Sequence, residues 1–374
     1  MGLTIGFDGA PTMQGAGVGR YSSCLLGALL AQPSEDTITI VLPRGASPPE
    51  VTARAQSPWR VVYLPVGERW AELLWHRLRL PLPADLLAGW PAVFHSPNFL
   101  LPPLRRARGV VTVHDLSFLR VPQFAYPGLA RYLSATVPRS VRRADVILAD
   151  SQCTADDVTD LLGVPPERVR VVYPGVGPEY RPEAAPGEWD TLTAAYGLER
   201  PYVLCVGTIE PRKNYPAAIE GFLRFAQDAG FTGNLVIAGA TGWMADESLA
   251  AARQAGPAVR LLGRVPDEHL PALYRQAAAL LYPSHYEGFG LPPLEALACG
   301  TPVVVARNSS LSEAVGGAGV FCSGDPASIA EALAVALAGG PEGERRRQEG
   351  LAWARQFTWE RAAEAVRQVY HELA

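Results

Sequence analysis

The chain has 374 residues, of which 48% are apolar and 19% are charged, and a formal net charge of −4 at pH 7. This length predicts two domains, and the composition excludes disordered, fibrous and disulfide-scaffold proteins. The slightly negative charge provides no overall basic field, so we expect no nucleic-acid partner. Five scattered cysteines without CxxC spacing favour free thiols in a cytoplasmic protein over bridges or a zinc site. No apolar run is long enough to span a bilayer, so we expect no membrane-spanning segment.

Short apolar runs alternate with polar or amphipathic segments along the whole chain. Before residue 175 the runs are LTIGF, TITIVL, VVYL, AVFH, VVTVHD, DVILAD and RVVY. A second series follows with PYVLCVG, NLVIAGA, RLLGRV, ALLYPS, PVVVA and GVFC. Such alternation predicts βαβ units and parallel sheets. We therefore predict an α/β fold with two Rossmann-like doubly wound domains.

The stretch between the two series is RPEAAPGEWD (181–190), which has no apolar period and is typical of a linker. We place the domain boundary there, with the first domain at 1–182 and the second at 183–357. The final segment, 358–374, has apolar residues at helical spacing after Thr358, which predicts a capped C-terminal helix.

HYEGFGLPPLE (285–295) follows the strand-like run LLYPS and contains two consecutive prolines, which are tolerated only in a first helical turn. This order places Glu287 in a loop and Glu295 about one turn into a helix. Gly288 and Gly290 would let a ligand approach backbone N–H groups at the helix start, a region that favours anions. Carboxylates suit hydroxyls and repel phosphate, so the stretch suggests a nucleotide sugar. The alternative is a capping and a surface glutamate flanking an ordinary turn.

Other strand exits carry further polar residues. Arg212 and Lys213 follow PYVLCVG, where two adjacent cations would suit a diphosphate, although a lone pair of this kind is usually a solvated surface. His114 lies at the end of the run VVTVHD; a single histidine there is more often structural than catalytic. The glycines of GAGVG before the first helix could admit phosphate, but their spacing is not GxGxxG, so a nicotinamide cofactor is weakly supported.

With these residues assembled, the sequence resembles the retaining glycosyltransferases of family 4, which have the GT-B architecture of two Rossmann-like domains. The resemblance covers nearly the whole chain, through GAGVGRY, FHSPNFLLP, TVHDLSFL, ADSQCTADD, VVYPGV, VGTIEPRKN, LLGRVPDEHL, HYEGFGLPPLEALACGTPVV and FTWERAA. It implies that the C-terminal helix packs back on the first domain. It also implies a nucleotide-sugar donor, no metal, and a glycan or lipid-linked acceptor.

The resemblance assigns roles to individual residues. Glu287 would meet the donor sugar, Glu295 the ribose, and Arg212 and Lys213 the diphosphate, with His114 lining the sugar site. The implied catalytic residues are thus Arg212, Lys213, Glu287 and His114, and the implied donor-binding residues are Gly17, Gly207, Val265, Gly288, Phe289, Gly290, Leu291 and Glu295. The similarity of VGTIEPRKN to mannosyltransferases favours GDP-mannose, with UDP-sugars left open.

The segment ERWAELLWHRLRLPL combines Trp70, Leu73, Leu74 and Leu78 with nearby arginines, and PPLRRARG adds more. A membrane surface or a lipid diphosphate would suit such a cluster, giving peripheral association with the inner membrane face. The sequence favours the other interpretation, a core-facing helix with a solvated basic edge.

Three rival functions share parts of this pattern. A sugar-nucleotide 2-epimerase would also place a nucleotide between two Rossmann-like domains, but the RKN loop together with HYEGFGLPPLE favours transfer. A nicotinamide-dependent dehydrogenase lacks its fingerprint. A non-catalytic sugar-binding module is least favoured, because both acids and both cations are present.

Overall fold

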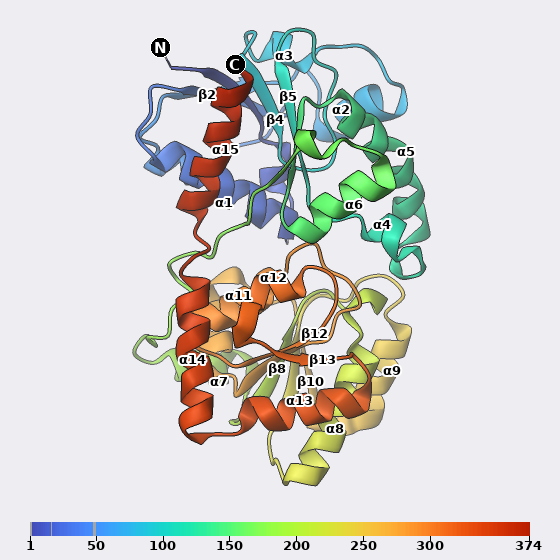
Figure 1. The fold of residues 1–374 in the computed structure, drawn as a ribbon, viewed down its shortest axis with the longest axis vertical. Coiled ribbons are helices and arrows are strands. Elements are labelled where there is room, and N and C mark those ends of the chain that lie inside the picture. Colours follow the sequence, from blue (N-terminus) through green and yellow to red (C-terminus); the bar gives the residue numbers. More distant parts are fainter. Residues whose placement is uncertain (1, 16, 48–49) are drawn as a thin grey trace. The chain divides into compact units, whose positions relative to one another are not determined.

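The computed structural model describes residues 2–15, 17–47 and 50–374, which form two compact units (Figure 1). The first unit comprises the chain up to Leu119, Gly128–Gly175 and Thr358–Ala374; the second comprises Arg120–Pro127 and Val176–Phe357. The units thus part at Gly175, before the residue 182 that the sequence suggested, and a short segment from the first half of the chain belongs with the second unit.

The first unit contains a seven-stranded parallel sheet in the order β3-β2-β1-β4-β5-β6-β7. Its strands are β1 (Thr4–Asp8), β2 (Thr37–Leu42), β3 (Trp59–Tyr63), β4 (Val93–Ser96), β5 (Arg108–Val113), β6 (Val146–Ala149) and β7 (Val169–Val171). Its helices are α1 (Gly17–Ala31), α2 (Glu68–Glu72), α3 (Ala84–Leu87), α4 (Ser117–Arg120), α5 (Pro127–Arg143), α6 (Gln152–Leu162) and α15 (Trp359–Leu373).

The second unit contains a six-stranded parallel sheet in the order β10-β9-β8-β11-β12-β13. Its strands are β8 (Tyr202–Val206), β9 (Asn234–Ala238), β10 (Val259–Gly263), β11 (Ala279–Tyr282), β12 (Val303–Ala306) and β13 (Val320–Cys322). Its helices are α7 (Glu188–Tyr196), α8 (Tyr215–Ala229), α9 (Asp246–Ala255), α10 (Leu270–Gln276), α11 (Leu291–Ala298), α12 (Leu311–Val315), α13 (Pro326–Leu337) and α14 (Gly340–Ala354).

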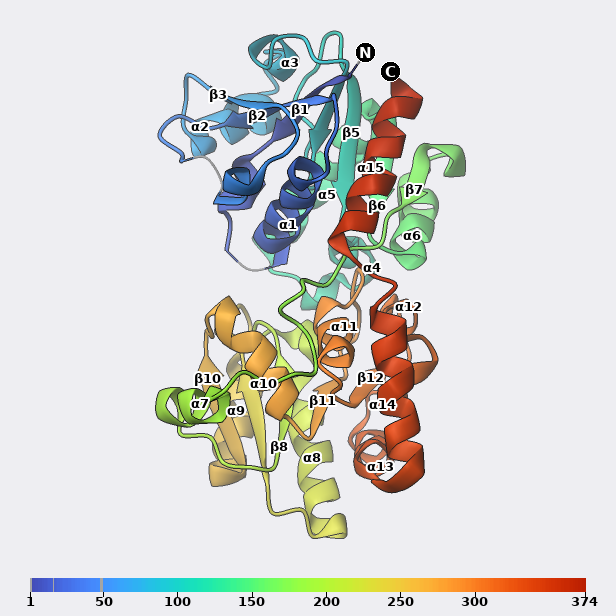
Figure 2. The same ribbon diagram turned by 90° about the vertical axis from the view of Figure 1, so that its left-hand side faces the viewer.

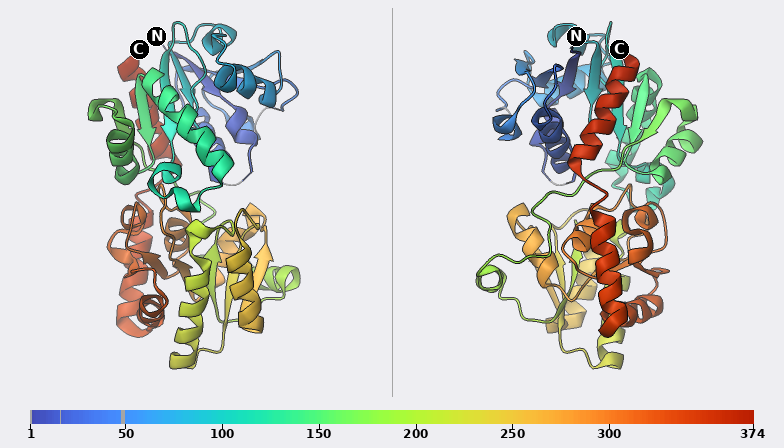
Figure 3. Two further views of the ribbon diagram at one scale, coloured as in Figure 1. Left: turned by 90° about the vertical axis from the view of Figure 1, so that its right-hand side faces the viewer. Right: turned by 60° about the vertical axis from the view of Figure 1, so that its left-hand side comes forward.

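Both sheets are covered by helices on two faces, as the doubly wound prediction requires. In the first unit α1 and α15 lie on one face and α5 on the other (Figures 1 and 2). In the second unit α8 and α9 cover one face (Figure 3, left) and α10 and α11 the opposite one (Figure 2). Every apolar run named in the sequence forms a strand, and the central strands are buried because parallel sheets are covered on both sides, whereas the edge strands β3, β7 and β10 are partly exposed.

The C-terminal helix α15 begins as predicted, because the Thr358 hydroxyl accepts the N–H of Arg361. Its apolar stripe is buried in the core of the first unit, with Val366 and Tyr370 fully covered. Arg367 and His371 pair with buried Asp36, which attaches the far end of the helix. Buried apolar side chains over about three turns, from Trp359 to Tyr370, hold α15 on the first unit together with these ion pairs.

The linker prediction was only partly right. Residues 181–187 contain no regular element, but α7 begins at Glu188, inside the stretch 181–190 that was predicted to be a linker. The Glu188 carboxylate is buried and pairs with the Arg275 guanidinium of α10, and Gln276 also donates to it. The start of α7 could not be predicted from the sequence, because an ion pair between residues far apart in the chain leaves no local pattern.

The cysteines are free thiols, as predicted: Cys205, Cys299 and Cys322 are buried, and Cys24 and Cys153 are half-buried. Within residues 2–15, 17–47 and 50–374, no helix is long and apolar enough to cross a membrane.

Candidate active site

Two strand exits of the second sheet meet at its topological switch point. The strand order reverses between the central neighbours β8 and β11, which pair with each other while their following helices leave in opposite directions. Ligands of open α/β sheets bind beyond the carboxyl ends of the strands at such a point. The loop after β8 carries Arg212 and Lys213, and the loop after β11 carries Glu287, so the fold brings these predicted residues together.

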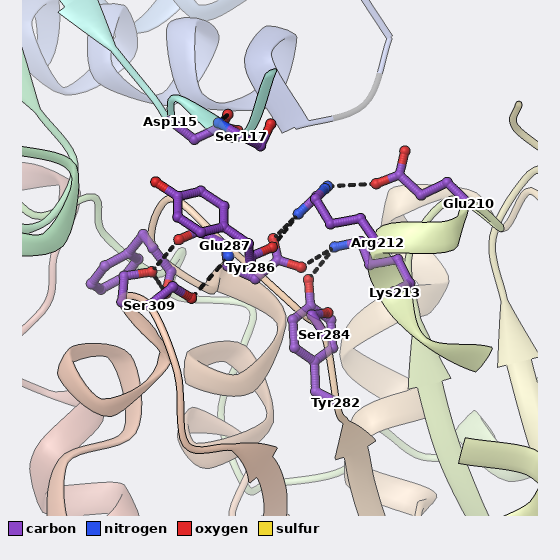
Figure 4. Close-up of polar contacts among 12 residues, drawn as sticks. Asp115, Ser117, Glu210, Arg212, Lys213, Tyr282, Ser284, Tyr286, Glu287 and Ser309 are labelled. Atoms are coloured by element: carbon purple, nitrogen blue, oxygen red, sulfur yellow. Dashed lines mark hydrogen bonds and ion pairs between the residues drawn. The ribbon is translucent and has the colours of Figure 1, made fainter. Parts of the chain in front are cut away.

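Arg212 lies between two carboxylates (Figure 4). Its guanidinium contacts Glu287 Oε2 at 2.8 Å through Nη1 and Glu210 Oε1 at 2.6 Å through Nη2. The same Nη1 donates to the carbonyl oxygen of Tyr286 at 2.7 Å. Because a guanidinium is planar and rigid, three acceptors in these positions fix its orientation.

Lys213 lies beneath the same carboxylate (Figure 4). Its Nζ donates to Glu287 Oε1 at 2.7 Å and to the hydroxyl of Tyr282, at the end of β11, at 2.5 Å. Only 10% of each of the Lys213 and Glu287 side chains is exposed. Two of the three ammonium hydrogens are thus occupied by described residues, which leaves one for a ligand.

The cations keep Glu287 ionised despite its burial. Burial alone would raise the pKa of Glu287, but Arg212 and Lys213 lower it from 4.5 to about 2. Burial lowers the pKa of Lys213, and Glu287 opposes this only in part. Burial raises the pKa of Glu210, which Arg212 counteracts in part. At neutral pH the Glu287 carboxylate can therefore only accept hydrogen bonds.

The loop that carries Glu287 is held by backbone contacts. The Glu287 N–H donates to the hydroxyl of Ser309 at 2.9 Å. The hydroxyl of Ser310 donates to the carbonyls of Glu287 and Phe289 at 2.8 and 2.9 Å. These contacts fix the position of the carboxylate without using its oxygens.

Gly207, directly after β8, has a backbone conformation that requires glycine. Its φ is +142°, and an added Cβ would lie 3.2 Å from Cε of Lys213. Its carbonyl accepts the hydroxyl of Tyr215 at 2.8 Å. A side chain at this position would press against Lys213, so the geometry of the site explains why residue 207 is a glycine.

The predicted strand–loop–helix order of HYEGFGLPPLE is confirmed. Gly290 precedes α11 with a φ of +115°, and the helix begins at Leu291, followed by the two prolines. The Phe289 side chain is buried in the core, so any contact with a ligand there would come from the backbone. The start of α11 presents N–H groups that no intrahelical acceptor can satisfy.

Glu295 lies on α11 and is only 2% exposed. Its Oε2 accepts the hydroxyl of Tyr274 at 2.9 Å. A ribose contact would have to reach a carboxylate that is already hydrogen-bonded inside the second unit. Val265 is buried as well, which leaves only its backbone to meet a base, and Gly288 is buried beside Glu287. The roles inferred for these three residues stay predictions.

The first unit holds the remaining predicted residues. Gly17 is exposed at the first position of α1, with open space where a side chain would be. His114 follows β5, and its Nδ1 contacts Asp150 Oδ2 at 2.8 Å while its Nε2 contacts the carbonyl of Pro97 at 3.0 Å. Both ring nitrogens therefore face acceptors, which suits an imidazolium that donates twice. Burial lowers the pKa of His114, but Asp150 outweighs it, and the pKa is raised.

This geometry changes the interpretation of His114. In the described arrangement neither ring nitrogen is left to contact a sugar, so such a role would require one of the two bonds to break. The predicted sugar contact is untested, whereas the structural role that the sequence also suggested has visible partners.

Several residues that complete the site were not identified as functional from the sequence. Glu210, Tyr282 and Ser309 all contact Arg212, Lys213 or Glu287 directly. Glu210 stands two residues before Arg212, and Tyr282 ends a recognised strand, so strand-exit reasoning could have included them. Ser309 lies after another strand and had no signal of its own. Among the described residues, no group of three or more His, Cys, Asp or Glu side chains is placed to hold a metal ion.

The segment ERWAELLWHRLRLPL differs from the helix that the sequence favoured. Trp70 is 62% exposed and Leu78 57% exposed, so the expected core-facing helix is wrong for these side chains. The segment is instead short: α2 ends at Glu72 and continues as one π-helical turn, η3 (Leu73–Arg77). Because α2 and η3 together are too short to bury a full apolar stripe, Trp70 and Leu78 near their two ends remain exposed to solvent.

Comparisons with known proteins agree with this architecture. Residues 16–180 match the family Glycosyltransferase Family 4, and residues 194–353 match Glycosyl transferases group 1. The chain is 35% identical over 273 residues to O-antigen chain mannosyltransferase B of Escherichia coli, covering 72% of this chain and 71% of that protein. It is 33% identical over 315 residues to D-inositol 3-phosphate glycosyltransferase of Acidothermus cellulolyticus, covering 76% and 68%.

A solved structure extends the likeness over the whole chain. Anabaena Alr3699/HepE, in complex with UDP and glucose, superposes with a TM-score of 0.70 at 17% identity, covering 99% of this chain and 100% of that one. At this identity the likeness concerns the fold alone. Together with the two family matches and the relatives above, it shows that the chain belongs to the family 4 glycosyltransferases and has the GT-B fold.

Proposed function

We propose that this glycosyltransferase moves mannose from GDP-mannose to a hydroxyl of a glycan or a lipid-linked acceptor, with retention of the anomeric configuration. The observation that carries the proposal is the ion-pair cluster at the switch point of the second sheet, where two fixed cations flank an ionised glutamate. The similarity to a mannosyltransferase supports the choice of sugar.

Arg212 and Lys213 would stabilise the departing diphosphate. As the bond between the sugar and the phosphate breaks, negative charge grows on the phosphate oxygen, and cations that are already fixed need no rearrangement to meet it. The remaining ammonium hydrogen of Lys213 would donate to a phosphate oxygen, and the start of α11 would add partial positive charge. We assign charge neutralisation to these groups and therefore propose that transfer requires no divalent metal.

Glu287 would hold sugar hydroxyls rather than attack the sugar. A carboxylate with a pKa of about 2, bound by two cations, is a weak base and a weak nucleophile. Each of its oxygens still has a lone pair for a hydroxyl donor. This supports front-face substitution, in which the acceptor hydroxyl enters on the side that the diphosphate leaves and gives its proton to the phosphate oxygen.

The second candidate is transfer from a UDP-sugar. It is favoured by one observation, the UDP and glucose complex of the structurally similar Alr3699/HepE. Base recognition through buried Val265 would use the backbone, which does not distinguish guanine from uracil by side-chain type.

Thermal unfolding with GDP, UDP and ADP in parallel tests the donor. A ligand that binds only the folded state raises the apparent stability in proportion to ln(1 + [L]/Kd). A shift with GDP supports the mannosyl proposal, and incubation with GDP-mannose and EDTA should still release GDP. A shift with UDP alone contradicts the donor, and no shift with any of the three contradicts the nucleotide site.

A further inference from the structure

The first unit presents an exposed strip in which arginine and leucine alternate. Residues 77–82, RLRLPL, begin at the last residue of η3, and Leu78, Leu80 and Leu82 are 57%, 39% and 50% exposed. Arg77, directly before Leu78, and Arg79, between Leu78 and Leu80, are exposed as well. Three solvent-facing leucines in six residues are unusual for a surface, because single apolar side chains are normal but contiguous ones mark interaction sites.

The strip is held in place by hydrogen bonds. The N–H groups of Leu78 and Leu80 donate to the carbonyls of Leu73 and Leu74, each at 2.8 Å. The indole N–H of Trp75 donates to the carbonyl of Leu82 at 2.9 Å. The exposed leucines are thus presented by a backbone with fixed partners.

Helix α3 and the loop after it extend the strip into a larger face. Leu86 and Leu87 on α3 are 48% and 38% exposed. The N–H of Ala84, the first residue of α3, donates to the carbonyl of Pro103, so the loop that begins at Pro103 lies against this helix. We call residues 77–82, 86, 87, 105 and 106 the Arg–Leu face; its α3 part and α2 are labelled in Figure 2.

The acid within this face is directed inward. The Asp85 carboxylate is fully buried and accepts the backbone N–H groups of Arg105, Arg106 and Ala107 at 2.7 to 3.1 Å. The guanidinium of Arg106 lies 4.4 Å from the centre of the Trp90 ring. The Asp85 oxygens thus accept backbone amides of the loop and not the guanidinium groups of Arg105 and Arg106.

The mixture of charge and apolar surface indicates the kind of partner. Arginine side chains suit phosphate groups, and leucines between them suit the acyl boundary below, which is the pattern of an interfacial segment. A second copy of this chain paired through a two-fold axis would bring like charges together and be repelled. The exposed acid nearest in sequence, Glu68, lies before the face and accepts the amide of Gln14.

We propose that the Arg–Leu face docks on an anionic lipid surface, with the leucines entering the interface and the arginines contacting lipid phosphates. The proposal goes beyond the transfer reaction, since it uses none of the residues of the second unit and would hold for any donor. It supplies a reason for the exposure of Leu78, Leu80 and Leu82 on the first unit.

Vesicle co-sedimentation tests the face. We expect the protein to pellet with vesicles of equal parts phosphatidylcholine and phosphatidylglycerol, and to stay in solution with phosphatidylcholine alone. Each arginine near an anionic surface contributes about a five-fold gain in binding, so the Arg77→Gln/Arg79→Gln variant should bind about 25-fold more weakly. Leu78→Ser should also weaken binding, and added salt should weaken it further.

Matched variants elsewhere serve as controls. Arg181→Gln/Arg355→Gln removes two exposed arginines from the second unit, and Leu161→Ser changes an exposed leucine on α6. Neither control should alter binding, and all variants should keep the wild-type unfolding temperature and GDP-induced shift. No pelleting with anionic vesicles, or equal pelleting of the Arg77→Gln/Arg79→Gln variant and wild type, overturns the proposal. Sedimentation of a dimer that Leu78→Ser dissociates, without vesicle binding, assigns the face to self-association and also overturns it.

Discussion

Replacing Lys213 by methionine should separate its catalytic role from its structural role. Methionine keeps much of the side-chain length but removes the charge that contacts Glu287 and Tyr282. Removal of one fixed donor aimed at developing charge typically lowers kcat by about 10² to 10³. We expect a fall of this size in GDP release from GDP-mannose.

The structure also sets the magnitude of the effect on stability. The pKa of Glu287 falls from 4.5 to about 2, which corresponds to about 3 kcal/mol in favour of the ionised form in the folded state. Arg212 and Lys213 share this stabilisation, so loss of Lys213 should lower the free energy of unfolding by about half of it, or roughly 2 kcal/mol. Because the pKa is lowered on folding, the contribution is full above pH 4.5 and is lost as the pH falls toward 2.

The assays are steady-state GDP release and urea unfolding at pH 7 and pH 3, with the Glu287→Gln and double variants for a thermodynamic cycle. The double variant Lys213→Met/Glu287→Gln should be more stable than Lys213→Met alone, because it has no buried carboxylate that lacks an ammonium partner. It should recover none of the activity. The destabilisation by Lys213→Met should shrink at pH 3. A kcat within tenfold of wild type in a folded Lys213→Met variant would refute the reasoning.

Three further predictions concern residues away from this pair. Burial raises the pKa of Asp8 from 3.8 to about 6, so keeping this side chain ionised in the folded protein costs about 3 kcal/mol above pH 6 and nothing below pH 3.8. In urea unfolding, Asp8→Asn should therefore raise the free energy of unfolding by that amount at pH 8. At pH 3.5 the variant and the wild type should be equally stable. Tyr274→Phe removes a partner of buried Glu295 and should lower the free energy of unfolding by about 1 to 3 kcal/mol, and an unchanged value would mean that the carboxylate finds another donor. Glu188→Gln should cost about 3 kcal/mol because it leaves Arg275 with a buried, poorly compensated charge, which thermal unfolding can measure; Tm equal to wild type would show the pair to be dispensable.

The architecture was predictable because its signal is local. Each strand is a short apolar run bounded by polar segments, and parallel strands buried on both faces have no other pattern. The start of α15 was also readable, since a threonine cap followed by residues at helical spacing depends only on the nearby sequence. Arg212, Lys213 and Glu287 were found by the rule that chemistry lies at strand exits, and the switch point brought them together.

The misjudged features depend on contacts between distant residues. The burial of Glu188 follows from its pairing with Arg275, a residue far away in the sequence. The exposure of Trp70 and Leu78 follows from where η3 ends, which spacing alone could not show. None of these leaves a mark within a window of a few residues.

The most direct test of the central claim is calorimetric titration of GDP into wild-type protein and Lys213→Met side by side. The account predicts that wild type binds GDP and that the variant binds at least tenfold more weakly, because a cation facing the diphosphate is gone. Equal affinity of the two proteins for GDP, with both folded, would contradict the assignment of the ion-pair cluster as the diphosphate site.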